Sequence, residues 1–397
     1  MPRYLSLAAL LGVLLLSGCS LKQSSGDSGG GAPVAVPSKG AKSSDKKAAA
    51  QLGFPVSATR NTTRVSGSDA AADAAGVASA IFPSTSLETR PPAVVLVDKD
   101  DWQGAVAAGA LVAAPLRAPI LLSDGGGLPA ITSETLDRLK PKGAQLASGA
   151  QAILVGDKPG PPHGLKASRI RGSDPYTVAV AIDKFTSVAR GKPAGDVVVA
   201  SGEKPEFSMP AAAWAARSGD PVLFTKKDTL PPQTVAALKQ HQKPHIYLLG
   251  PTTAVSVAVE KQLAKLGPVK RIASLDPVQN AIAFAKFKKG AFGFGANVPG
   301  QNLTVANLSR PSDAAAAAGL AANGVFAPLL LTSSPSLPRN LESYLLDLQP
   351  GFANGDPSKG VYNHVWLLGG GDAISPASQD RIDAASALIP VDKQPGQ

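Results

Sequence analysis

The chain has 397 residues, a formal net charge of +10 and a single cysteine. One cysteine forms no internal disulfide, so a packed core must hold the fold together. Basic residues are in excess in the segment 20–63 and in the middle third. They do not form one continuous stripe, which argues against a nucleic-acid-binding protein.

The N-terminal segment is typical of an exported chain. Arg3 is followed by an apolar run from Leu5 to Leu16 and then by Leu-Ser-Gly-Cys, which ends at Cys19. The run is too short to span a bilayer, and small residues of a cleavage site follow it. It resembles a bacterial lipoprotein signal. The resemblance implies a signal peptide over 1–18, lipidation of Cys19, and an extracytoplasmic location, anchored to the membrane and facing the cell wall.

The next segment, 19–63, is rich in Ser, Gly, Ala, Lys and Pro and has almost no large apolar residue. This composition predicts a flexible stalk behind the lipidated cysteine. No later segment approaches the roughly 20 uninterrupted apolar residues of a membrane helix. We therefore expect a body that is tethered to the membrane by acyl chains.

One pattern then occurs three times. "RVSGSDAA" begins at Arg64, "RIRGSDPY" at Arg169 and "RIASLDPV" at Arg271. After each start come a helical pattern, a β-rich run, an alanine-rich helix, a Pro-led strand, a Leu-Pro helix start, and a strand that stops at glycine. The register predicts three repeats, followed by a short tail; their bounds are 64–168, 169–270 and 271–390, with the tail at 391–397.

The predicted strands are continuous apolar runs, such as "AVVLV" from Ala93 and "DVVVA" from Asp196. Runs of this kind are typical of strands buried on both faces, and the helices between them supply the crossovers. We therefore expect an α/β fold with three small, mostly parallel sheets, packed as a pseudo-threefold body. The first repeat has a Pro-Gly loop after Gly156, where Ser256 and Ser375 predict helix starts in the other two repeats.

In the order of these elements, residues 64–390 resemble the cell-wall-binding repeat family of clostridial and other Gram-positive surface proteins. The resemblance implies three Rossmann-like repeats that bind the anionic secondary polymer of the wall non-covalently. It also implies that the apolar Ile-Leu-Leu signature takes part in polymer binding. In this chain the signature residues are Ile120, Leu121, Leu122, Val222, Leu223, Phe224, Leu329, Leu330 and Leu331.

The polar residues of the opening motif have a structural interpretation. In Asp174-Pro175 and Asp276-Pro277, the aspartate stands where a helix N-cap belongs, and Gln279 is spaced for a capping box. Arg64, Arg169 and Arg271 either pair with an acidic group of a neighbouring repeat or face an anionic ligand. We favour the structural pairing and keep the three arginines as candidate polymer-binding residues.

The chain offers few candidates for catalysis. Asp98, Asp100 and Asp101 follow the end of a predicted strand, where open α/β sheets bind ligands. The cluster does not recur in the other repeats, so a solvated acidic loop is the favoured interpretation over a metal site. His241 and His245 are interrupted by Pro244, which indicates a surface turn.

The sequence thus predicts a protein without catalytic residues, metal or cofactor. With the two resemblances, we expect it to bind an anionic wall polymer and to contact the membrane through the lipid on Cys19, with other envelope proteins as further candidate partners. Two alternatives stay open. One is the solute-binding lipoprotein of a transporter, which would have two lobes joined by hinge strands. The other is a wall-acting hydrolase that uses Asp98, Asp100 and Asp101.

Overall fold

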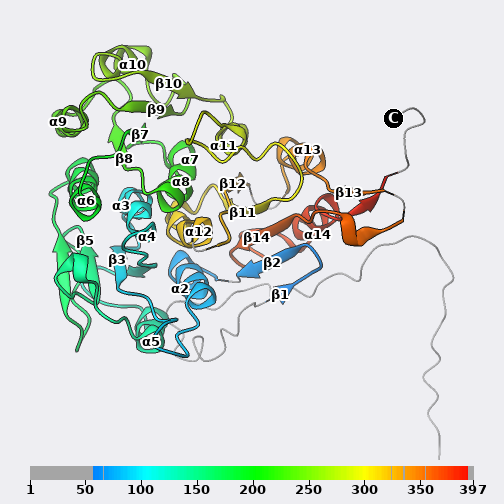
Figure 1. Cartoon of the computed structure of the whole chain (residues 1–397), viewed down its shortest axis with the longest axis horizontal. Coiled ribbons are helices and arrows are strands. Elements are labelled where there is room, and N and C mark those ends of the chain that lie inside the picture. Colours follow the sequence, from blue (N-terminus) through cyan, green and yellow to red (C-terminus); the bar gives the residue numbers. More distant parts are fainter. Residues whose placement is uncertain (1–56, 66, 323, 334–335, 354, 392–397) are drawn as a thin grey trace, which may run out of the picture. The chain divides into compact units, whose positions relative to one another are not determined.

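The computed structural model describes residues 57–65, 67–322, 324–333, 336–353 and 355–391 (Figure 1). All of them belong to one of the two units into which the chain divides, Val34–Gln397. Within these ranges, no helix is long and apolar enough to cross a membrane. The predicted signal peptide, Cys19 and most of the predicted stalk lie outside the described residues.

The first sheet has four parallel strands in the order β4, β3, β5, β6. Their bounds are Ile120–Ser123 for β4, Val94–Asp98 for β3, Ala152–Val155 for β5 and Ala167–Ile170 for β6. The second sheet is also parallel, in the order β10, β9, β7, β8. Its bounds are Val269–Ile272, His245–Leu249, Asp196–Ser201 and Val222–Thr225.

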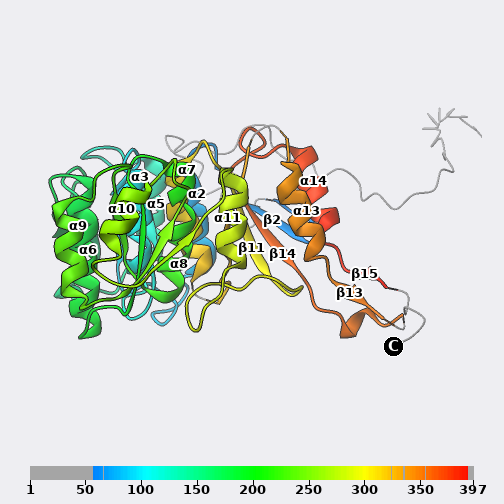
Figure 2. The same cartoon turned by 90° about the horizontal axis from the view of Figure 1, so that it is seen from above.

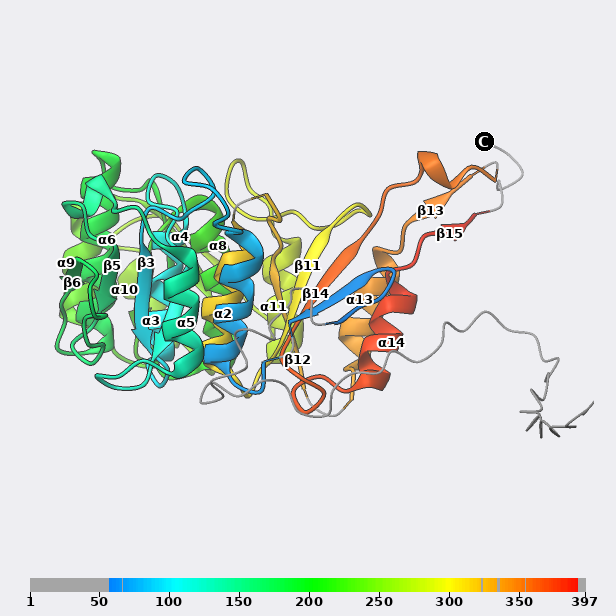
Figure 3. The same ribbon diagram turned by 90° about the horizontal axis from the view of Figure 1, so that it is seen from below.

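The third sheet has the order β1, β2, β14, β11, β12, and only the short β1 runs antiparallel to its neighbour. Its bounds are Ser57–Ala58, Thr62–Val65, His364–Leu368, Asn302–Asn307 and Leu329–Thr332. A separate parallel pair, β13 (Gly351–Phe352) and β15 (Ile389–Pro390), lies near the end of the described chain (Figure 3). The predicted class, α/β with small and mostly parallel sheets, is confirmed.

The opening strand of each repeat belongs to the sheet of another repeat. Strand β6, with Arg169, completes the first sheet, and β10, with Arg271, completes the second. Strand β2, with Arg64, pairs with β14 of the third repeat, just over three hundred residues along the chain. The repeat visible in the sequence is therefore offset from the sheet by one strand. Because the first repeat supplies a strand to the sheet of the third repeat, the exchange of strands forms a closed ring.

Helices cover the outer faces of the sheets. Helices α2 and α5 pack with the first sheet, α6 and α9 with the second, and α11, α13 and α14 with the third, where α13 and α14 lie side by side (Figure 2). The bounds are Ala70–Ile81 for α2, Ala130–Leu139 for α5, Pro175–Arg190 for α6, Pro232–Gln240 for α9, Val257–Leu263 for α10, Pro277–Lys286 for α11, Arg339–Asp347 for α13 and Pro376–Ala385 for α14. Short 3-10 turns occupy Gln145–Ala147, Pro311–Asp313 and Pro357–Lys359.

The alanine-rich helices of the three repeats meet at the centre of this unit, as Figure 1 shows for α4, α8 and α12. The first repeat divides its helix into α3 (Trp102–Ala107) and α4 (Gly109–Val112); the second has α7 (Pro205–Ser208) and α8 (Pro210–Ser218), and the third has α12 (Ala314–Ala321). A Cβ atom at Gly109 would lie 2.6 Å from the carbonyl oxygen of Ala212. Small side chains thus let the helix backbones touch, and the expected pseudo-threefold packing follows from this contact.

Candidate functional site

Each opening arginine donates a hydrogen bond to the carbonyl of the glycine that ends the neighbouring strand. The Nη1–O distances are 2.9 Å from Arg64 to Gly369, 2.7 Å from Arg169 to Gly156 and 2.8 Å from Arg271 to Gly250. Among the described residues, Arg271 is the one of the three that also has an acidic ion-pair partner, Glu260, at 2.9 Å. Burial lowers the pKa of Arg64 to about 10. The three arginines thus hold strand ends in place, and their part in polymer binding stays a prediction.

The aspartates of the opening motif cap helices, as predicted. Asp69, Asp174 and Asp276 each accept a hydrogen bond from a backbone N–H in the first turn of the following helix. The capping box forms at Asp174, with Thr177 as its partner. The side chain of Gln279 instead accepts from Ser274, so the expected box at Asp276 is wrong.

The nine residues of the apolar signature lie in strands β4, β8 and β12 and are at most 2% exposed. In β4, Ile120 and Leu122 face the core shared by all three repeats, whereas Leu121 faces the core under α2 and α5. In β12, Leu330 likewise faces away from its two neighbours. The signature therefore joins two core layers. Its side chains present no surface to a ligand in this structure, and direct polymer contact by them stays a prediction.

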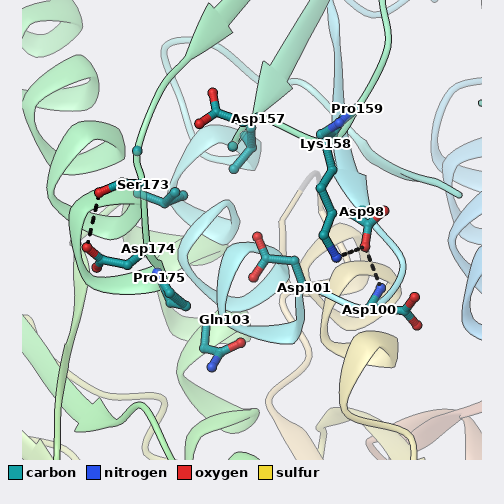
Figure 4. Close-up of a pocket in the computed structure, with 14 residues that line it drawn as sticks. Asp98, Asp100, Asp101, Gln103, Asp157, Lys158, Pro159, Ser173, Asp174 and Pro175 are labelled. Carbon is teal, nitrogen blue, oxygen red and sulfur yellow. Dashed lines mark hydrogen bonds and ion pairs between the residues drawn. The ribbon is translucent and has the colours of Figure 1, made fainter. Parts of the chain in front are cut away.

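A cleft of about 310 Å³ lies at the carboxyl ends of β3 and β5 (Figure 4). We call it the acidic cleft, since its described lining includes one basic residue, Lys158, and five aspartates: Asp98, Asp100, Asp101, Asp157 and Asp174. The N-terminus of α6, from the second repeat, borders it. The cleft thus lies where open α/β sheets place ligands, at the contact between two repeats.

The carboxylates of Asp98, Asp100 and Asp101 are already engaged in the fold. Asp98 is 2% exposed and accepts from Lys158 Nζ at 3.1 Å and from Gly125 N at 2.8 Å. Asp100 pairs with Lys99. Asp101 caps α3. Its burial, and to a smaller extent the nearby negative charge of Asp98, raise its pKa. Among the described residues, no group of His, Cys, Asp and Glu side chains is arranged to hold a metal ion.

The structure corrects the expectation for one histidine. His241 is buried, and its ring nitrogens lie 2.8 Å from Asp183 Oδ2 and 2.8 Å from the carbonyl oxygen of Ala194. Burial is the largest influence and would lower the pKa of His241, but the hydrogen bond to Asp183, the negative charge of Asp183 and the contact with the Ala194 carbonyl together outweigh it, and the net pKa is raised. The expectation of a surface turn rested on Pro244, whereas the partner of the buried ring, Asp183, lies 58 residues away. A contact of that separation leaves no local pattern.

Sequence reasoning also missed a buried charge cluster at the contact between the first and third repeats. Arg310 pairs with Asp73 of α2, and its Nε lies 2.9 Å from Asp313 Oδ2. Both carboxylates are fully buried. Asp73 also accepts from the backbone nitrogens of Gly67 and Gly369. We call these three residues the closure triad, because they join the two ends of the repeat order.

The closure triad predicts a pH dependence of stability. Burial raises the pKa of Asp313 from an ordinary 3.8 to about 6, with Arg310 opposing the rise. Between these pH values the folded state binds more protons than the unfolded chain, so the free energy of unfolding should fall from about pH 4 to about pH 6. Asp313→Asn should make this fall smaller in urea titrations across that range. Asp356→Asn, at an exposed aspartate, should leave it in place, and equal slopes for both variants would contradict the prediction.

Tandem parallel α/β repeats around a shared alanine-rich helical centre define the class of this protein. The family model that matches is cell wall binding domain 2 (CWB2), over residues 169–260. The resemblance drawn from the sequence is confirmed, and the chain carries a cell wall binding domain. Such a domain implies an extracytoplasmic location at the cell surface.

Two relatives from Bacillus subtilis (strain 168) are similar to parts of this chain. The protein named amidase enhancer is 28% identical over 210 residues, which are 51% of this chain and 27% of the relative. The N-acetylmuramoyl-L-alanine amidase LytC is 27% identical over 221 residues, which are 55% of this chain and 39% of the relative. The chain thus spans well under half the length of these curated relatives.

Two solved structures from Clostridium difficile share the fold. Cwp6 has a TM-score of 0.63 at 17% identity, covering 81% of this chain and 48% of that one. Cwp8 has a TM-score of 0.63 at 21% identity, covering 82% of this chain and 52% of that one. Because each match covers about four fifths of this chain, the likeness extends beyond the segment that the family model matches.

Proposed function

We propose that this protein binds an anionic polymer of the cell wall non-covalently through its three repeats, without catalysis. It is held at the outer side of the membrane by a lipid on Cys19. The observation that carries the proposal is the CWB2 match over 169–260, on a unit whose fold is repeated three times in the chain.

The position of the polar groups supports a binding role rather than hydrolysis. The three carboxylates that a hydrolase would use already have other roles. Asp98 pairs with Lys158, Asp100 forms a surface ion pair with Lys99, and Asp101 caps helix α3. A solute-binding lipoprotein would have two lobes joined by hinge strands. The described residues instead form three larger sheets, one for each repeat, that exchange their opening strands.

The proposal is tested with the chain from Ser20 onward and walls from a Gram-positive bacterium, before and after their anionic polymer is stripped. We expect retention on untreated walls and its loss on stripped walls. Retention should also weaken with salt, because the screening length falls from about 10 Å at 0.1 M to about 3 Å at 1 M. Equal retention on both wall preparations contradicts the polymer as ligand.

Catalysis and anchoring have separate tests. Labelled walls incubated with the protein should release no soluble fragments, and release that Asp100→Asn abolishes would support the hydrolase instead. In cells, Cys19→Ala should move the protein from the membrane fraction to the medium or the wall, because no acyl chain can be attached. An unchanged membrane fraction would contradict the lipid anchor.

A further inference from the structure

A second pocket lies where the three alanine-rich helices end. Its volume is about 450 Å³, and each repeat contributes to its lining: Ala113 and Arg117 from the first, Ala216 and Arg217 from the second, Ala322 and Phe326 from the third. Each helix runs back from the carboxyl end of its strand, so this pocket lies at the opposite edge of the sheets from the acidic cleft. We call it the arginine pocket.

The arginine pocket has the charge that an anionic ligand requires. Arg117 and Arg217 are exposed, and none of the described residues that line the pocket is acidic. Within the described part of the chain, neither guanidinium takes part in an ion pair or a hydrogen bond; the guanidinium of Arg217 lies 4.5 Å above the ring of Phe326. Five aspartates line the acidic cleft. Of the two pockets, the arginine pocket is therefore the one that suits an anion.

The backbone beneath two of these side chains is strained. Arg117, Gly219 and Phe326 each stand two residues before the proline that leads the next strand, and their φ angles are +54°, +75° and +58°. The turn thus requires the left-handed conformation in all three repeats, a conformation that glycine adopts readily and other residues disfavour. Only the second repeat has glycine there. The other two keep a cation and an aromatic ring, both at the arginine pocket.

Strain of this kind is often kept where the side chain has a function. Phe326 is 48% exposed, although burial would stabilise so large an apolar group. A cationic pair beside an exposed ring offers an ionic contact and an apolar contact to the same ligand. A sugar that carries an anionic group has both of these features.

We propose that the arginine pocket binds one anionic sugar unit of the wall polymer, with Arg117 and Arg217 on its phosphate or carboxylate and Phe326 against the sugar. This inference rests on the proposed function. It adds that the protein has one such site, shared by three repeats, rather than one site in each repeat. A single site follows because the position at the strained turn has a different residue in each repeat: Arg117, Gly219 and Phe326.

The strained turn gives a sharp test with the full chain. Arg117→Gly and Phe326→Gly remove strain, so each should leave the melting temperature unchanged or raise it. Both should weaken binding to a short glycerol-phosphate oligomer or to a polyuronate of equal length, measured by calorimetry. We expect at least a tenfold loss for Arg117→Gly combined with Arg217→Ala. We expect less than a twofold loss for Arg60→Ala combined with Arg339→Ala, which removes two exposed arginines outside the pocket.

The unchanged chain should bind one short oligomer per molecule, and whichever of the two probes binds identifies the anionic group. Three oligomers per chain, or equal affinity of the pocket variant and the unchanged chain, would overturn the single site while leaving the proposed function intact. Failure of the unchanged chain to bind walls and both probes would overturn both proposals. Preferential binding to phosphatidylglycerol vesicles, lost in the same pocket variant, would reassign the pocket to a lipid surface and overturn the wall polymer as its ligand.

Discussion

Replacing Arg310 by alanine is expected to lower the free energy of unfolding by about 3–5 kcal/mol at pH 7. Arg310 is the cation between two carboxylates, Asp73 and Asp313, whose side chains are fully buried. Without it, both carboxyl groups must either stay charged with no cation paired to them or take up a proton. Burial already raises the pKa of Asp73 well above its ordinary value. Chemical unfolding of the variant and the unchanged chain measures the difference.

The matched control is Arg381→Ala. Arg381 also pairs with a carboxylate, that of Glu342, but its side chain is 46% exposed. Water takes the place of the lost partner there, so the change should be much smaller. At pH 4 the loss for Arg310→Ala should also be smaller than at pH 7, because the buried carboxyl groups are then protonated. Equal losses for the two variants would show that the closure triad contributes no more than a surface pair.

A chain that begins at Gly67 is expected to lose the native third sheet. Strand β2 is buried along its whole length and covers one edge of β14. Its Arg64 also donates to Gly369, Gly370 and Gln379. Removing the strand uncovers backbone groups and apolar surface, which invites pairing with other chains. We expect a lower melting temperature and aggregation in size-exclusion chromatography.

A chain that begins at Ser57 serves as the control, because it keeps every residue of β1 and β2. Its melting temperature should equal that of the full chain. A synthetic peptide of residues 57–65 should restore stability to the shorter chain, since a missing edge strand can be supplied in trans. If the chains starting at Ser57 and at Gly67 melt at the same temperature, the exchanged strand is dispensable.

The local features of the fold were predictable from the sequence. Continuous apolar runs marked the strands, and glycine or proline marked their ends, so the strands and helices of the three repeats fall where the register predicts. The absence of a helix after Gly156 and the N-caps at Ser256 and Ser375 are likewise confirmed. These features depend on residues a few positions apart, and single-chain patterns carry that information.

The nonlocal features were not predictable. Each opening strand was predicted to belong to its own repeat. The segment "RIRGSDPY" has no local feature that indicates which sheet it joins. Arg310 occupies the position of Asp101 in the first repeat. Because the residue type differs between the repeats, the register does not predict an ion pair between Arg310 and Asp73. The Asp-Lys-Asp-Asp segment suggested a cluster of carboxylates that could act together. In the structure each of its three carboxylates has a different partner. Pairing across the contacts between repeats decides the first two cases, and contacts within the first repeat decide the third.

The exchange of opening strands also limits how this architecture can change in length. Each sheet is complete only when the following repeat is present, and the third sheet takes its strand from the first repeat. A single repeat therefore does not form a complete folding unit. Inserting a fourth repeat would separate β2 from β14 or leave two sheet edges without a pairing strand. By the same logic, a circular permutant that joins the end of the third repeat to the start of the first, and opens the chain between two other repeats, keeps every strand pairing.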